Sequence, residues 1–254
     1  MRLGFIGTGK MGAALVTAAL NVVEPQDIIC SDENKDVLVK IEANGVPVTQ
    51  DNSEVVSRSD MIFLCVKPQK MEEVIKDLKV DREKAFVSIA AGIKITLLEK
   101  MLPGQRIIRL MPTIGCIVNE MAAAYALGSN VTEEDEKALL KIFSNAGLVV
   151  KVDEKDMDVV TALTAPAYIA YIIGIMAHEA AKQGLDKETA LKLACQTAVA
   201  TGKLVSESTP EDIIGMVCSP GGTTEAGMRV LKGTEKSLRD TIKAAVERSK
   251  ELGE

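Results

Sequence analysis

The 254-residue chain contains no tryptophan, a single histidine and only 3% aromatic residues. Proteins that bind nucleic acids stack bases on aromatic rings and hold phosphates with clustered lysine and arginine. This chain has a formal net charge of −6 and no stretch rich in basic residues, so we expect no nucleic-acid partner. Apolar residues make up 47% and charged residues 26% of the chain, which is typical of a globular protein with a buried core.

The cysteines are far apart in the sequence, and none of them forms a CxxC pair. Metal centres and disulfide frameworks need clustered ligands or paired spacings, so we predict neither. Reduced thiols are typical of the cytoplasm, which is the compartment that we expect. The cysteines are Cys30, Cys65, Cys116, Cys195 and Cys218.

The start of the chain lacks the basic segment, apolar core and cleavage site of a secretory signal. One stretch, residues 159–177, carries no charge over nearly the length of a membrane span. It contains Pro166 and two threonines and stands alone in the chain. Burial against another subunit is therefore favoured over a membrane helix.

In the first part of the chain, short apolar runs alternate with helix-like segments such as residues 34–44 and 133–145. Two of the runs, 61–66 and 85–90, are almost continuously apolar, as expected for strands that are covered on both faces. Strands that alternate with helices predict a parallel, doubly wound sheet with right-handed crossovers. The expected strands are residues 2–6, 27–30, 61–66, 85–90 and 106–110, with further candidates at 121–127 and 148–152.

The pattern changes near residues 152–158, after which we predict helices only. The predicted fold class is therefore α/β. An N-terminal Rossmann-type doubly wound sheet would occupy residues 1–152, and an all-helical domain would follow over residues 153–254.

The stretch GTGKMG follows the first expected strand and opens a helix. Glycine allows a sharp turn, and the N–H groups at a helix N-terminus can bind a pyrophosphate. In this strand–turn–helix setting the pattern predicts a dinucleotide-binding turn. The predicted contacts are Gly7, Thr8, Gly9, Lys10, Met11 and Gly12.

The second expected strand ends at Ser31 and Asp32. A carboxylate at the position of Asp32 can accept hydrogen bonds from an adenosine ribose and would repel the extra phosphate of NADP. Lys35 is near enough in the sequence to offset that charge, and Asp32 can alternatively cap the following helix. The choice between NADP and NAD therefore stays open.

A second turn, SPGGTT at residues 219–224, has similar ingredients late in the chain. Ser219 is expected to cap a helix and Pro220 to stand in its first turn, while two glycines leave backbone N–H groups open to a carboxylate. The hydroxyls of Thr223 and Thr224 can donate to an oxygen or a nitrogen. These residues alone predict either a small-anion site or merely a capped helix start.

The longer stretch CSPGGTTEAGM closely resembles the signature of the pyrroline-5-carboxylate reductase family. Individually weaker matches follow the family's order along nearly the whole chain. They are GFIGTGKMG at 4–12, VKP at 66–68, AAG at 90–92, PAY at 166–168 and KQGL at 182–185.

The resemblance implies an oxidoreductase that uses NADP or NAD to reduce the C=N bond of Δ1-pyrroline-5-carboxylate to L-proline, the last step of proline biosynthesis. It also implies that the C-terminal helices interleave with those of a second copy, in a dimer or a ring of dimers. The expected partners are thus a small cyclic imino acid and further copies of the chain, without nucleic acid or membrane.

The resemblance also implies roles for single residues. Thr224 would be the catalytic residue, which hydrogen-bonds the ring nitrogen and relays its proton. Glu207 would stabilise the protonated imine, although an exposed helix-end carboxylate is the other interpretation. The substrate would be held by Glu207, Ser219, Gly221, Gly222, Thr223 and Thr224. Further cofactor contacts would come from Ser31, Asp32, Asn52, Val66, Lys67, Pro68, Ala90, Ala91 and Gly92.

Two segments depart from the family pattern. Residues 111–115 read MPTIG where the family commonly has MPNTP, and residues 163–168 are shortened. We therefore keep open a reductase of a related cyclic imino acid, such as a six-membered ring, a β-hydroxyacid dehydrogenase, and a cofactor-binding sensor with weak catalysis. The single histidine, His178, is expected to be structural or exposed, since it has no placed partners.

Overall fold

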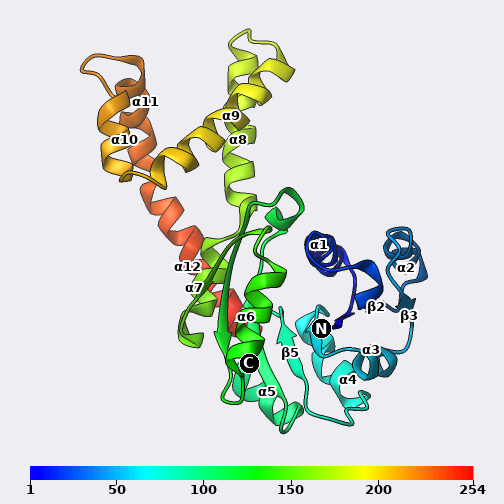
Figure 1. The fold of residues 1–254 in the computed structure, drawn as a ribbon. Coiled ribbons are helices and arrows are strands. Elements are labelled where there is room, and N and C mark those ends of the chain that lie inside the picture. The colour runs from blue at the N-terminus through cyan, green and yellow to red at the C-terminus, as the bar shows by residue number, and fades with distance from the viewer. Residues whose placement is uncertain (254) are drawn as a thin grey trace. The chain divides into compact units, whose positions relative to one another are not determined.

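The computed structural model describes residues 1–253 and divides into two compact units, coloured along the chain in Figure 1. The first unit comprises Met1–Thr164 together with residues 243–253, and the second comprises Ala165–Ile242. The sheet lies wholly in the first unit, and the described part of the second unit is helical. The compact units divide after Thr164. They are defined by contacts within the chain, so the functional domain border expected at residues 152–153 stays a prediction.

The first unit is built on one eight-stranded sheet with the order β3-β2-β1-β4-β5-β6-β7-β8. Every strand that the apolar runs predicted is present. The structure adds the two-residue strand β3, which is too short to show a hydrophobic pattern and pairs with β2. The strands are β1 (Leu3–Ile6), β2 (Ile28–Ser31), β3 (Val48–Thr49), β4 (Met61–Leu64), β5 (Ala85–Ser88), β6 (Arg106–Met111), β7 (Met121–Leu127) and β8 (Gly147–Lys151).

All strand pairs are parallel except one, because β7 runs antiparallel to β6. The expectation of a parallel sheet was wrong at this pair. A parallel return needs a crossover of roughly a dozen residues or more, usually a helix. Residues 112–120 hold only the short 3-10 helix η3 (Ile114–Val118), so the chain reverses instead. The doubly wound, mostly parallel α/β class is confirmed.

Three helices of this unit, α2, α3 and α6, begin at a side-chain cap. The Asn34 side chain accepts the N–H of Asp36 in the first turn of α2, and Thr132 and Asp135 form a reciprocal capping box at the start of α6. The helices of this unit before its border are α1 (Lys10–Ala19), α2 (Lys35–Glu42), α3 (Asn52–Arg58), α4 (Met71–Lys76), α5 (Ile95–Met101), α6 (Glu133–Ile142) and α7 (Met157–Leu163).

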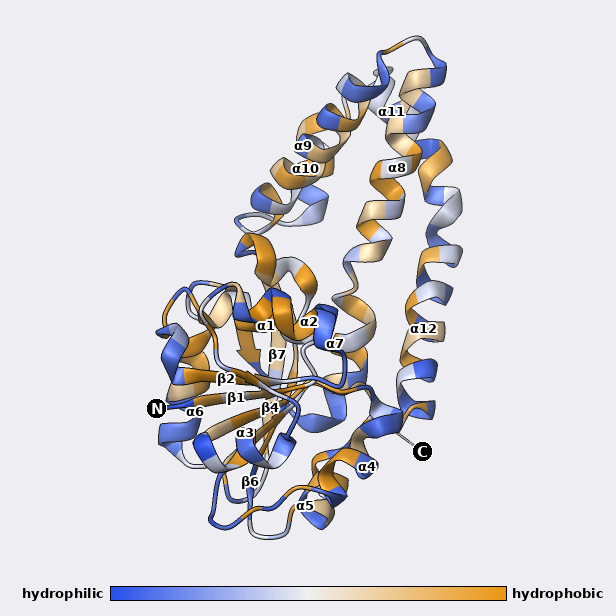
Figure 2. Ribbon diagram, turned by 90° about the vertical axis from the view of Figure 1, so that its right-hand side faces the viewer, coloured by the Kyte–Doolittle hydropathy of each residue, from blue (hydrophilic) through white to orange (hydrophobic). Residues whose placement is uncertain are grey.

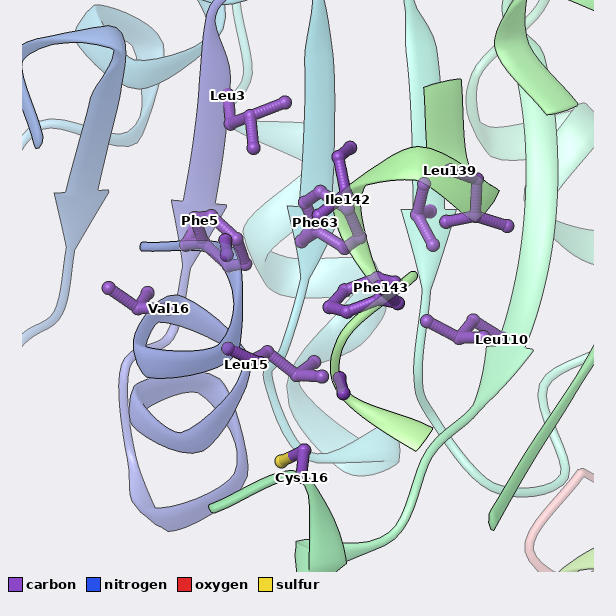
Figure 3. Packing of buried hydrophobic residues seen from close by; sticks show 14 of the residues in the cluster. Leu3, Phe5, Leu15, Val16, Phe63, Leu110, Cys116, Leu139, Ile142 and Phe143 are labelled. Atoms are coloured by element: carbon purple, nitrogen blue, oxygen red, sulfur yellow. The ribbon is translucent and has the colours of Figure 1, made fainter. Parts of the chain in front are cut away.

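Each face of the sheet carries its own buried apolar cluster. On one face, α1 and α6 cover the strands through side chains that include Leu15 and the nearby Phe143, as Figure 3 shows. The rings of Phe5 and Phe63 stack with centroids 4.6 Å apart, and Phe143 meets Phe63 edge-on at 5.8 Å. Apolar burial stabilises the sheet, and each aromatic pair adds about 1 kcal/mol.

The second unit has a small core of its own. Ala177 of one helix packs with Ala190 and Ala194 of the next. Gly184, with φ of 101°, follows the end of the first of these helices, and Asp186 caps the second. The helices are α8 (Pro166–Lys182), α9 (Lys187–Val205), α10 (Pro210–Val217), α11 (Thr223–Leu231) and the first part of α12 (Glu235–Glu251).

Large apolar side chains of the second unit are exposed in the single chain. On α8, Ile169 is 54%, Tyr171 72% and Ile175 52% exposed. Figure 2 shows the long hydrophobic stretches on α8 and α9. An apolar surface of this kind is typical of helices that are covered by another protein chain.

Within residues 1–253, one helical stretch, Glu154–Lys182, is long and apolar enough to cross a membrane by length and composition alone. It is interrupted, because α7 ends at Leu163 and α8 begins at Pro166. A single stretch of this kind is weak support for a membrane span, since helices that pack against protein pass the same test.

Candidate functional site

The glycine turn after β1 leads directly into α1, with Gly9 as its N-cap. Gly7 has φ of 85°, and a Cβ there would lie 2.7 Å from Cγ1 of Val66. A Cβ on Gly12 would overlap the carbonyl oxygen of Gly7, so α1 packs closely on the turn. The space beside Gly9 is open for 4 Å. The turn thus leaves the first N–H groups of α1 open to a ligand.

Thr8 shows that the turn fits a phosphate-bearing cofactor. The residue is fully buried, and its Oγ1 has no hydrogen-bond partner among residues 1–253. An unsatisfied buried hydroxyl costs about 1–3 kcal/mol, which a ligand oxygen would offset. This hydroxyl and the open N–H groups fit a dinucleotide diphosphate.

A hollow of about 460 Å³ lies beside the turn, a volume in the usual range for small-molecule sites. It opens at the carboxyl ends of β1, β2 and β4, where the strand order reverses, the usual ligand position in open α/β sheets. The structure brings several of the predicted cofactor residues together here. They are Gly7, Gly9, Asp32, Asn52, Val66 and Lys67.

Other residues line the same hollow without having been predicted. Three of them, Glu33, Asn34 and Cys65, follow β2 or β4 within three positions, so the rule that ligands bind at strand ends would have found those three. They are Ile6, Glu33, Asn34, Val37, Cys65, Lys70, Glu73 and Val74. The remaining predicted cofactor residues do not line the hollow: Thr8, Lys10, Met11, Gly12, Ser31, Pro68, Ala90, Ala91 and Gly92.

Asp32 supports the turn before α2 but is not its cap. Its Oδ1 accepts the N–H of Asn34 at 2.9 Å, and Asn34 itself is the N-cap. Asp32 lines the hollow, and among residues 1–253 its Oδ2 has no hydrogen-bond partner. The carboxylate can therefore hold the turn and still accept a ribose hydroxyl.

Carboxylates outnumber ammonium groups in the lining. Asp32, Glu33 and Glu73 contribute three negative charges, whereas Lys67 and Lys70 contribute two positive charges. The Nζ of Lys70 lies 2.9 Å from Glu73, and this hydrogen bond raises the pKa of Lys70. The excess of negative charge disfavours an additional phosphate on the ribose.

The thiols near the hollow are not charged groups. Burial raises the pKa of Cys65, which lines the hollow, and that of Cys30 on β2. Both thiols therefore remain protonated at neutral pH and act as small apolar groups.

The second glycine turn has a different geometry from the one that the sequence suggested. Ser219 does not cap the helix, and Pro220 is not in its first turn, because α11 starts only at Thr223 with Gly222 as N-cap. Gly221 has φ of 76°, which interrupts any helix that would start earlier.

Two of the expected donors at this turn already have partners. The N–H of Gly221 donates to Oε2 of Glu225 at 2.9 Å, and that of Gly222 donates to the carbonyl of Ser219 at 2.9 Å. Among residues 1–253, the N–H groups of Thr223 and Thr224 and their hydroxyls make no hydrogen bond within the chain. Those four groups are the donors that remain for a carboxylate.

The other residues considered in the second unit are exposed. Glu207 lies in the turn between α9 and α10, and among the described residues its carboxylate has no hydrogen bond. His178 is exposed on α8. Over residues 1–253 there is no group of three or more side chains that could hold a metal ion.

Comparison with known proteins identifies the family of the chain. A family model described as pyrroline-5-carboxylate reductase dimerisation matches residues 154–252. A pyrroline-5-carboxylate reductase of Methanosarcina acetivorans is 41% identical over 264 residues, which covers 99% of this chain and 98% of that protein. This chain belongs to the pyrroline-5-carboxylate reductase family. The resemblance predicted from the sequence is thus confirmed.

Further members of the pyrroline-5-carboxylate reductase family agree. The enzyme of Arabidopsis thaliana is 36% identical over all of this chain and 96% of its own length. The crystal structure of the Plasmodium falciparum pyrroline carboxylate reductase with NADP bound has a TM-score of 0.92 and 28% identity, covering 100% of this chain and 98% of that one. The structure from Coxiella burnetii gives 0.88 and 31%, with the same coverage of both chains.

The comparisons also divide the family's fold between the two parts of the chain. A model described as NADP oxidoreductase, coenzyme F420-dependent, matches residues 2–92, which include the first glycine turn. An N-terminal Rossmann-type sheet domain and a C-terminal helical dimerisation domain are therefore confirmed, and the latter supports self-association.

Proposed function

We propose that this protein is a pyrroline-5-carboxylate reductase, which reduces the cyclic imine Δ1-pyrroline-5-carboxylate to L-proline with NADPH or NADH. The observation that carries the proposal is the identity of 41% with the Methanosarcina acetivorans reductase over almost the full length of both chains. The nicotinamide cofactor supplies a hydride for the imine carbon.

The first turn and the hollow beside it are the proposed cofactor site. The N–H groups at the start of α1 and the hydroxyl of Thr8 would hold the diphosphate. Asp32 and Asn52 would hold the adenosine end, because both line the hollow at the ends of strands. The loop of Ala90–Gly92 is proposed to contact the half of the cofactor that carries the nicotinamide.

The second turn is the proposed site of the substrate carboxylate. Thr223 and Thr224 offer N–H groups at the start of α11, where the helix dipole favours an anion. The hydroxyl of Thr224 would hydrogen-bond the ring nitrogen and carry its proton, and Glu207 would stabilise the positive charge of the protonated imine. Ser219, Gly221 and Gly222 shape this turn.

Self-association follows from the dimerisation domain, and we propose a dimer or a ring of dimers as its form. The exposed apolar side chains of α8 and α9 support the proposal, since a second copy would bury them. We also propose the cytoplasm as the compartment. All five cysteines are unpaired, as reduced thiols are there.

The test is oxidation of NADH or NADPH, followed spectroscopically, with pyrroline-5-carboxylate and with its six-membered analogue as substrates. We expect turnover with the five-membered ring. Faster turnover with the six-membered ring would assign the related imino acid as substrate. Cofactor binding without turnover of any imine would contradict the proposal, as would oxidation of a 3-hydroxyacid.

A further inference from the structure

The end of the chain lies against the loop that follows β5. Gly92, in this loop, has φ of 80°, and a Cβ there would lie 2.6 Å from the backbone N of Gly253 and 2.7 Å from the carbonyl oxygen of Ser249. A Cβ on Gly253 would overlap the carbonyl oxygen of Gly92. The backbone of the loop is in direct contact with the backbone at the end of α12. A side chain at either glycine would therefore push the two segments apart.

A buried polar cluster fastens the same helix end. Ser249 is 2% exposed, and its Oγ donates to Oδ1 of Asp158 at 2.8 Å. Arg109, which is 1% exposed, lies 3.4 Å from the same Asp158 oxygen and 3.6 Å from Oε1 of Glu154. If one member moves away, a buried polar group is left without its partner, and this costs free energy. The intact cluster therefore holds the end of α12 in place.

The fastened loop continues β5, the neighbour of the strand whose following residues line the hollow. β5 pairs in parallel with β4, and the N–H of Ile89 donates to the carbonyl of Leu64 at 3.2 Å. The residues after Leu64, which include Val66, line the hollow. The loop of Ala90–Gly92 therefore leaves the sheet at the edge where the hollow opens.

We propose that Ser249 and Gly253 are positioning residues, which hold the backbone of Ala90–Gly92 in place for the nicotinamide-bearing half of the cofactor. This inference rests on the assignment of that loop to the cofactor under the proposed function. A loop with a left-handed glycine loses conformational freedom when it closes on a ligand. The last turn of α12 already holds the loop, so less conformational entropy is lost when the cofactor binds.

The test measures the Kd of NADH and of NADPH by calorimetry, without any imino acid. We expect Gly253→Ala to weaken binding of the preferred cofactor about fivefold or more, because the new methyl displaces the Gly92 carbonyl. Ser249→Ala removes only the hydrogen bond to Asp158, and we expect about threefold weaker binding. Glu251→Ala is the matched control, because Glu251 lies on the same turn and is exposed.

Circular dichroism melting accompanies each measurement, and Ser249→Ala decides the matter if Gly253→Ala does not fold. An unchanged Kd in a folded Ser249→Ala protein and a folded Gly253→Ala protein would overturn the inference. In turnover assays, KM for the cofactor should rise while KM for the imino acid stays constant. An equal rise of both would indicate general loosening and also overturn it. Failure of the wild type to reduce any imine would contradict the proposed function but leave this binding test intact.

Discussion

Ser31 donates a hydrogen bond from Oγ to Oδ1 of Asn52 at 2.7 Å, which ties the end of β2 to the start of α3. Ser31 is fully buried, whereas Asn52 lines the hollow beside the first glycine turn. Because Oδ1 of Asn52 faces Ser31, the amide NH₂ of Asn52 points away from Ser31. Among residues 1–253 this NH₂ has no acceptor. Asn52 thus offers a donor and Asp32 an acceptor at the part of the hollow that we propose for the adenosine.

Asp32→Ser should shift cofactor preference toward NADPH. A serine oxygen can still accept the N–H of Asn34, so the turn before α2 is kept while the charge is lost. Removing one carboxylate near an added phosphate is worth about 1–2 kcal/mol, or roughly tenfold in the ratio of kcat/KM for NADPH to that for NADH. Asp36→Asn, on the exposed first turn of α2, is the control. An unaltered ratio would mean that Asp32 only supports the turn.

Thr224→Ala should lower kcat about 100-fold and leave the Kd of the cofactor within about twofold. The variant removes a hydroxyl that we assign to proton transfer at the ring nitrogen, a contribution of roughly 10²–10⁴ in rate. Stopped-flow turnover and calorimetry separate the two quantities. Thr241→Ala removes a hydroxyl that bonds only to its own helix, at Ser237, and should have no effect. A normal kcat in Thr224→Ala would exclude this hydroxyl from the reaction.

Ile175→Glu should dissociate the assembly. The side chain is 52% exposed in the single chain, and burying an unpaired carboxylate in an apolar interface costs several kcal/mol. Sedimentation velocity is expected to show a dimer or larger for the wild type and a smaller species for the variant. Lys187→Glu, at the exposed start of α9, should not change the profile. A wild type that is active as a monomer would contradict the proposal that the C-terminal helices pack against those of a second copy.

Asp135→Asn should destabilise the first unit at neutral pH by about 2 kcal/mol, read from the urea midpoint at fixed protein concentration. Burial alone would raise the pKa of Asp135, but hydrogen bonds from Arg106, at 2.7 Å, and from Thr132 outweigh it and lower the pKa. The native carboxylate therefore contributes stability above its unfolded pKa of about 3.9, and that stability is lost as the pH falls through the lower native value.

The variant at position 135 should consequently show a flatter dependence of stability on pH below about 4 than the wild type. Asp153→Asn serves as the control, since Asp153 is exposed and pairs only with Lys155. Parallel pH profiles of the wild type and Asp135→Asn would show that the Arg106 bond is not the source of the shift.

The first glycine turn was predictable because its chemistry lies within six consecutive residues between a strand and a helix. The second turn was predictable as a motif, but the sequence placed the N-cap of the following helix at Ser219 instead of Gly222. Only the left-handed Gly221 shows where the helix begins. The lining of the hollow by Lys70 and Glu73 was missed, because no local pattern indicates which side chains turn back toward the strand ends.

The sequence by itself determined the alternation of strands and helices, the glycine turn between β1 and α1, and membership of the reductase family. All three depend on residue types at short spacings, where the physics is local. Only the tertiary structure decided that β7 runs antiparallel, that the hydroxyl of Thr8 is buried without a partner in the part of the chain that the structure describes, and that Gly253 rests on Gly92. These features come from the packing of segments that are distant in the chain, and hydrophobic periodicity carries no information about which distant backbones come together.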